Sequence, residues 1–74
     1  MRIKIKIKNG MNYPGPGDPS MVRDYEILNY DVHPELDFAR LAEKNRELYT
    51  ADSVEIYELL EGDEQGKFLA GATK

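Results

Sequence analysis

The chain offers a single imidazole, His33, in an acidic segment that runs from Asp31 to Asp37. Carboxylate and imidazole groups are the ligand types of metal ions that bind oxygen and nitrogen. Asp31, His33 and Asp37 are therefore a candidate metal site, or the acid–base group of a small carrier or metal-dependent enzyme. A structural interpretation competes with it, because acidic residues gather at helix N-termini for capping and dipole reasons. No second His and no Cys completes a recognised zinc spacing.

Other catalytic constellations are missing from the sequence. Nucleophilic catalysis needs a hydroxyl or thiol beside an oriented base, yet the chain has no Cys and no spacing links its hydroxyl residues to His33. The segment from Tyr13 to Ser20 is rich in glycine but is not a phosphate cradle, because proline removes N–H donors and no Gly-Lys-Ser/Thr follows. We expect a chain that is not an enzyme and holds no cofactor.

Charge is distributed unevenly along the chain. Residues 1–23 hold five basic residues and one acidic residue (+4), and residues 24–74 hold five basic and thirteen acidic residues (−8), which gives the net charge of −4. The basic residues of the opening segment alternate along it: Arg2, Lys4, Lys6 and Lys8.

This basic row has three interpretations. It could bind nucleic-acid phosphates, protect an edge strand from pairing with other chains, or face the carboxylates of Asp24, Glu26 or Glu55 across the sheet. No aromatic residue alternates with the lysines, and a negative chain repels phosphate. Nucleic-acid binding through this row is therefore an alternative, not the main hypothesis.

The acidic residues of the last third of the chain are candidates for binding a partner. If they share one surface, they could imitate nucleic-acid phosphates and occupy a basic groove on a nucleic-acid-handling protein. On the expected helix, basic and acidic residues lie three and four apart and cancel. The remaining candidates are Glu55, Glu58, Glu61, Asp63 and Glu64. The competing interpretation is a solvated acidic face.

A loop rich in glycine and proline is expected at residues 9–21, and a loop of this length inside a small domain is often functional. It carries Met11 and Tyr13, side chains of the adaptable and aromatic kinds that interfaces favour. The alternative is that Tyr13 and Met21 fold back to cover one end of the sheet.

Four strands and one helix must position these residues. Strict alternation predicts a strand from Arg2 to Lys8, with Ile3, Ile5 and Ile7 on the buried face. Further strands are expected at residues 22–30, 54–60 and 67–70, and a change of parity inside 22–30 indicates a bulge or a strand covered on both faces. The helix starts at Pro34 or after an Asp37 N-cap, and ends near Tyr49.

This order predicts a single small α+β domain over residues 1–74, with one helix packed on a four-stranded mixed or antiparallel sheet in ββαββ order. The opening Met1-Arg2-Ile3-Lys4-Ile5 resembles the start of ubiquitin-like chains, which implies a β-grasp arrangement. The final Ala70-Gly71-Ala72-Thr73-Lys74 has no Gly-Gly pair of the kind that carrier members conjugate.

The sequence has no Cys, no apolar run near the roughly 20 residues of a membrane helix and no signal-peptide core, so we expect a cytoplasmic protein. Its size and acidity resemble the small accessory and anti-defence proteins of phages and mobile elements, including anti-CRISPR proteins. That resemblance assigns no residue. We expect a non-catalytic protein-binding module that blocks a basic site on a larger protein.

Overall fold

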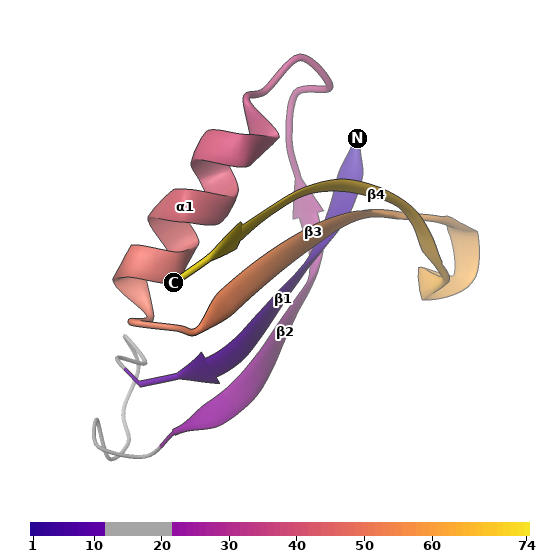
Figure 1. The fold of residues 1–74 in the computed structure, drawn as a ribbon. Coiled ribbons are helices and arrows are strands. Elements are labelled where there is room, and N and C mark those ends of the chain that lie inside the picture. The colour runs from indigo at the N-terminus through magenta and orange to yellow at the C-terminus, as the bar shows by residue number, and fades with distance from the viewer. Residues whose placement is uncertain (12–21) are drawn as a thin grey trace.

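The computed structural model describes residues 1–11 and 22–74, and within them the expected α+β class and ββαββ order are confirmed. Figure 1 shows the helix against one side of a twisted sheet. In chain order the elements are β1 (Arg2–Gly10), β2 (Arg23–Asp31), α1 (Phe38–Leu48), β3 (Ser53–Leu59), the short 3₁₀ turn η1 (Glu61–Asp63) and β4 (Gln65–Thr73). The last strand is longer than the sequence pattern predicts.

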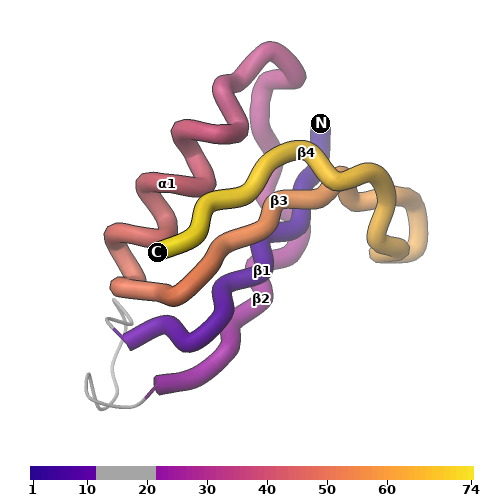
Figure 2. Tube along the Cα trace, viewed as in Figure 1, coloured from indigo at the N-terminus to yellow at the C-terminus, as the bar shows by residue number. Residues whose placement is uncertain are grey.

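The sheet has the order β2-β1-β3-β4, and each neighbouring pair is antiparallel (Figure 2). The antiparallel expectation is therefore confirmed and the mixed one is wrong. The topology also departs from the β-grasp expectation, because a β-grasp sheet pairs its first and last strands in parallel and here β3 separates β1 from β4. Since β1 lies inside the sheet, the interpretation of its lysines as protection of an edge strand is wrong.

The core lies between α1 and the sheet, and the alternation of β1 determines which side chains enter it. Ile3, Ile5 and Ile7 are at most 1 % exposed. Antiparallel register places Ile5 opposite Ile56 of β3, so apolar side chains meet directly across the two central strands. Burial of each such side chain stabilises the fold by about 1.5–3 kcal/mol. Ala42 of α1 is fully buried in the same cluster.

The helix begins after Asp37, the second of the two predicted starts. The Asp37 carboxylate accepts a hydrogen bond from the Arg40 backbone N–H at 3.1 Å, as an N-cap residue does. Pro34 lies in the turn that precedes the helix. Phe38 and Leu41 then pack against the core cluster, and α1 ends at Leu48 with Tyr49 as its C-cap.

The parity change predicted in β2 is a register irregularity. The partners of β1 jump from Tyr30 to Ile27, and the skipped Asn29 has a positive φ of 59°. β2 is not covered on both faces, since both Leu28 and Tyr30 are exposed.

At the end of β3 the buried residue is Leu59, whereas Leu60, which the sequence pattern placed on the buried parity, is exposed. Register shifts against β4 near Tyr57 accompany this change.

The helix covers one face of the sheet and packs chiefly against β4 and β3. The opposite face carries the even-numbered basic residues of β1, and within residues 1–11 and 22–74 no other element lies over it. None of the helices in these ranges combines the length and apolar character that crossing a membrane requires.

Candidate functional site

The acidic turn, residues 61–64 between β3 and β4, presents three exposed carboxylates on a defined backbone. Gly62 and Asp63 both adopt positive φ, 76° and 61°, and the Leu60 N–H donates a 2.7 Å hydrogen bond to the Glu64 carbonyl across the turn. Only glycine adopts the first of these conformations without steric cost. Glu61, Asp63 and Glu64 are all exposed, so the turn holds its charges outward.

Arg2 joins the acidic turn to the rest of the sheet. Its guanidinium donates to the Asn29 side-chain oxygen at 2.6 Å and to the Leu60 carbonyl at 3.0 Å, and lies 3.5 Å from the Asp63 carboxylate. A guanidinium can donate several hydrogen bonds in one plane, which suits a brace between segments. Sequence reasoning missed this role, because it depends on contacts between residues far apart in the chain.

The other carboxylates of the turn are less paired. Within the described part of the chain, Glu61 and Glu64 take part in no ion pair. Among the described residues, Arg2 is the cation that forms an ion pair with the turn, and Asp63 is the one carboxylate of the three with which it does so. The acidic turn therefore keeps a local excess of negative charge at the surface.

The predicted acidic set is not a single surface. Glu61, Asp63 and Glu64 lie together, and the structure places Glu58 at the base of the same hairpin, half-buried and across the ladder from Ile3. Glu55 lies elsewhere, in the middle of β3 and opposite Lys6.

Met11 lies at the other end of the sheet from the acidic turn. β1 starts at Arg2, which contacts the turn, and runs away from it to Gly10, just before Met11 (Figure 1). Met11 is 40 % exposed, and its N–H donates to the Tyr49 carbonyl. Tyr13 lies outside the described residues. The length of β1 therefore separates Met11 from the acidic turn.

The basic row lies between two acidic strands. Lys6 is directly opposite Glu26 on β2 and Glu55 on β3, and the Lys4 ammonium is 3.4 Å from the Glu26 carboxylate. This bears out the cross-strand interpretation of the row. The segregation of sign along the sequence thus becomes alternation in space, because the fold inserts the basic strand between the acidic ones.

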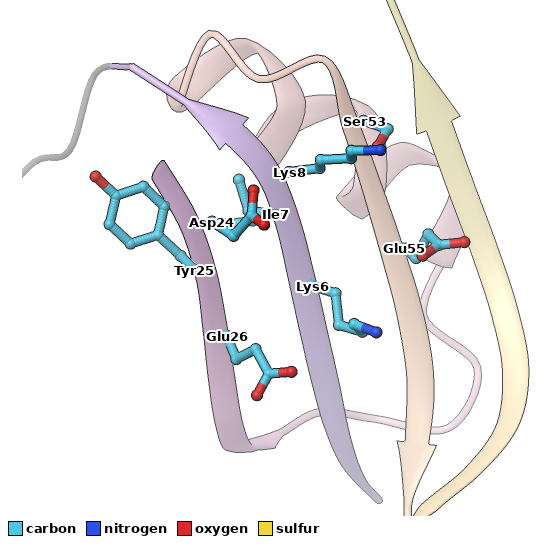
Figure 3. A pocket seen from close by; sticks show the side chains of 8 residues that line it. All are labelled: Lys6, Ile7, Lys8, Asp24, Tyr25, Glu26, Ser53 and Glu55. Atoms are coloured by element: carbon cyan, nitrogen blue, oxygen red, sulfur yellow. The ribbon is translucent and has the colours of Figure 1, made fainter. Parts of the chain in front are cut away.

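Residues of β1, β2 and β3 border a shallow hollow of about 390 Å³ on the open face (Figure 3). Its lining mixes both signs: Lys6, Ile7, Lys8, Asp24, Tyr25, Glu26, Ser53 and Glu55. A phosphate backbone would meet carboxylates on both sides of the lysines, which weakens the case for nucleic-acid binding.

An aromatic pair that sequence reasoning missed lies beside the basic row. Tyr57 and Phe68 meet edge to face, with ring centroids 5.5 Å apart, and the Lys6 ammonium lies 5.9 Å from the Tyr57 ring centroid. Partial burial raises the pKa of the Tyr57 phenol, and the charge of Glu55 and a hydrogen bond to it add to the rise. These residues are distant from the lysines in sequence, so alternation within β1 gives no signal of them.

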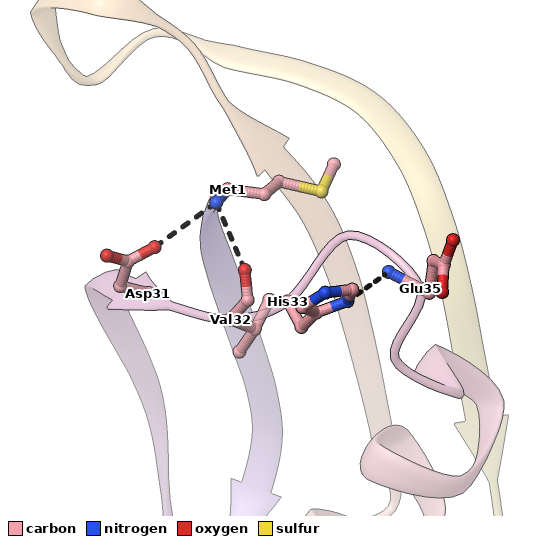
Figure 4. Close-up of polar contacts among 5 residues, drawn as sticks. All are labelled: Met1, Asp31, Val32, His33 and Glu35. Carbon is pink, nitrogen blue, oxygen red and sulfur yellow. Dashed lines mark hydrogen bonds and ion pairs between the residues drawn. The ribbon is translucent and has the colours of Figure 1, made fainter.

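The acidic segment around His33 consists of residues with separate local contacts (Figure 4). Asp31 pairs with the chain's terminal ammonium at 3.2 Å, the His33 Nδ1 accepts from the Glu35 N–H at 3.2 Å, and Asp37 caps α1. In residues 1–11 and 22–74 no three His, Cys, Asp or Glu side chains gather into a group that could hold a metal ion. The structure thus does not bring Asp31, His33 and Asp37 together as a site.

One ion pair within α1, between Arg46 and Glu43, has the three-residue spacing that the sequence predicts. Arg46 donates to the Glu43 carboxylate at 2.7 Å, and this hydrogen bond lowers the pKa of Glu43. The helix therefore adds little to any acidic surface.

Comparison with protein-family models, with curated proteins and with solved structures found no match.

Proposed function

We propose that this chain is a small, non-catalytic protein-binding module that places its acidic turn, residues 61–64, in a basic site of a larger protein. The observation that carries the proposal is the set of three exposed carboxylates on a turn whose backbone is fixed and braced by Arg2. Such a module would resemble the cytoplasmic anti-defence proteins of phages and mobile elements, among them anti-CRISPR proteins, in acting by coverage of a site.

Preorganisation supports this function for the acidic turn. A loop that must become ordered on binding loses affinity through the entropy of ordering. Here the hydrogen bond between Leu60 and Glu64 and the two hydrogen bonds from Arg2 hold the turn in place before any partner arrives. The free energy gained from contacts with the partner is then not reduced by the entropy of ordering the turn.

Electrostatics supports a basic partner. Exposed charges of one sign steer association with a surface of the opposite sign and raise the rate of encounter. Lysines of the open face have carboxylate neighbours, whereas Glu61 and Glu64 have no ion-pair partner among the described residues. The acidic turn thus groups three exposed carboxylates, two of which have no ion-pair partner among the described residues.

Affinity capture with matched charge variants tests the proposal. The turn variant carries Glu61→Lys and Glu64→Lys, which leaves the Arg2–Asp63 contact intact. The control variant carries Glu35→Lys and Glu47→Lys, at exposed positions before and on α1. Each variant changes the net charge from −4 by the same +4 to zero, so an effect of overall charge alone appears equally in both.

We expect the native chain and the control variant to capture the same basic protein from host or target cells, and the turn variant to lose it. Equal capture by all three chains, or equal loss in both variants, would contradict the proposal. Circular dichroism of each variant checks that the chain remains folded.

A further inference from the structure

The outer side of β4 is a strand edge that no other described element pairs with (Figure 2). An edge strand presents a row of backbone N–H and C=O groups that can template a further strand. Natural proteins usually blunt such edges with charged side chains, prolines or bulges that twist the strand away.

The two edges of this sheet differ in that protection. β2 carries four charged residues and a register irregularity at Asn29, whose φ is positive. β4 carries one charge, Lys67, along nine residues and contains no proline. The register of β4 against β3 shifts in the first part of the strand, between Gln65 and Ala70, but it is regular from Ala70 to Thr73. β4 is thus the edge that is suited to accept a strand.

The direction of its free backbone groups follows from the pairing with β3. The Lys74 N–H donates to the Asp52 carbonyl at 2.9 Å, so the backbone of Lys74 faces β3. Successive residues of an antiparallel strand alternate in the side to which they hydrogen-bond. Ala72 and Ala70 therefore also face β3, whereas Gly71 and Thr73 direct their N–H and C=O groups outward.

We propose that a second copy of this chain pairs antiparallel with β4 along this edge, with the two-fold axis beside Gly71. The two sheets would then form one continuous eight-stranded sheet. An isologous contact requires a surface that is complementary to itself. Here Gly71 would face the partner's Gly71, and Ala70 would face the partner's Ala72.

Charge also favours a second copy as the occupant. The one charged residue of β4, Lys67, lies four positions from the axis, so self-pairing brings no like charges face to face. The segment Ala70-Gly71-Ala72 is uncharged and small on both faces of the strand, so neither strand obstructs the other. This inference concerns a different surface from the acidic turn and does not depend on the proposed function.

Sedimentation equilibrium of the full chain tests the assembly. The 8.5 kDa chain is expected to reach 17 kDa, twice that mass, as its concentration rises toward about 1 mM, where even weak complexes assemble. Thr73→Pro removes an outward N–H and leaves the ladder to β3 in place, so this variant is expected to dimerise at least about 10-fold more weakly.

A cysteine placed at the axis tests the register, because the native chain has no thiol of its own. Directly opposite residues of a hydrogen-bonded antiparallel pair have Cα atoms about 5.5 Å apart, within the range that a disulfide spans. Gly71→Cys is therefore expected to cross-link to a dimer under mild oxidation. Its Cβ would lie 3.2 Å from the exposed ring of Phe68, which can move aside, and 3.3 Å from the Val54 carbonyl oxygen, so the backbone there must shift by a few tenths of an ångström. Leu28→Cys, exposed on the other edge strand, is the control and is expected to form no disulfide-linked dimer.

A mass of 8.5 kDa at every concentration would overturn the proposal. So would a dimer that Thr73→Pro does not weaken, or one in which Leu28→Cys cross-links as fast as Gly71→Cys, since the contact would then lie on another surface.

Discussion

At the residue scale, the start of α1 depends on the side chain of Asp37. Its carboxylate satisfies a backbone N–H that the helix leaves without a partner. Asp37→Ala should lower the free energy of unfolding by about 1 kcal/mol, measured by urea denaturation. Glu35→Ala, in the turn before the helix, is the matched control and should change the stability by less than about 0.5 kcal/mol. Equal losses in the two variants would show that the cap has no special role.

Tyr57 gives the open face a titration signal. Partial burial and the nearby Glu55 hold the pKa of its phenol above the ordinary value of about 10. The neutral phenol is therefore favoured in the folded state, and its contribution to stability is present below pH 10 and is lost as the pH rises through the folded pKa.

The Tyr57 ring resonance, followed by NMR, should titrate above pH 10 in the native chain and earlier in Glu55→Gln. Tyr57→Phe assigns the signal by removing it. A midpoint at or below that of free tyrosine would contradict the described environment.

At the element scale, the central pair β1 and β3 carries most of the core. Ile5→Ala leaves a cavity opposite Ile56 and should cost about 2–5 kcal/mol. That is a large share of the roughly 4–11 kcal/mol that a chain of 74 residues typically has in total. Chemical denaturation should show this loss, with Lys8→Ala on the exposed face as a near-neutral control. A small effect of Ile5→Ala would mean that the core lies elsewhere.

Local sequence patterns predict the elements of this fold but not the way in which the elements pair. The alternation of Ile3, Ile5 and Ile7 is sufficient to predict the strand and its buried face. Two local signals compete at the helix start, Pro34 and Asp37, and packing of Phe38 and Leu41 on the sheet favours the second. The order of the strands depends on pairing between segments that are far apart in the sequence. Periodicity within one segment contains no information about that pairing.

The same limit applies to the candidate site. Acidic residues at 61–64 are visible in the sequence, and the turn that displays them follows from the glycine at position 62. The brace from Arg2 and the distance to Met11 depend on which strand lies beside which. The sequence therefore indicates the candidate residues, but not that the acidic turn and Met11 lie at different ends of β1.

At the scale of the whole molecule, the fold distributes charge differently from the chain. The basic strand lies between acidic strands and has carboxylates beside it there, whereas the acidic turn groups three exposed carboxylates, of which only Asp63 has an ion-pair partner among the described residues. The structure extends over 34 × 24 × 16 Å, and β1 runs from Arg2, which lies beside the acidic turn, to Gly10, just before Met11. A partner that engages the turn need not contact Met11.

The dissociation constant of the complex with the captured partner tests this account most directly. It should be measured by calorimetry at one fixed salt concentration for the native chain, for Glu61→Lys/Glu64→Lys and for Glu35→Lys/Glu47→Lys. The account predicts binding weakened by about 100-fold or more in the turn variant, which corresponds to about 2.7 kcal/mol, and nearly native binding in the control variant. Native affinity in the turn variant, or the same loss in both variants, would contradict it.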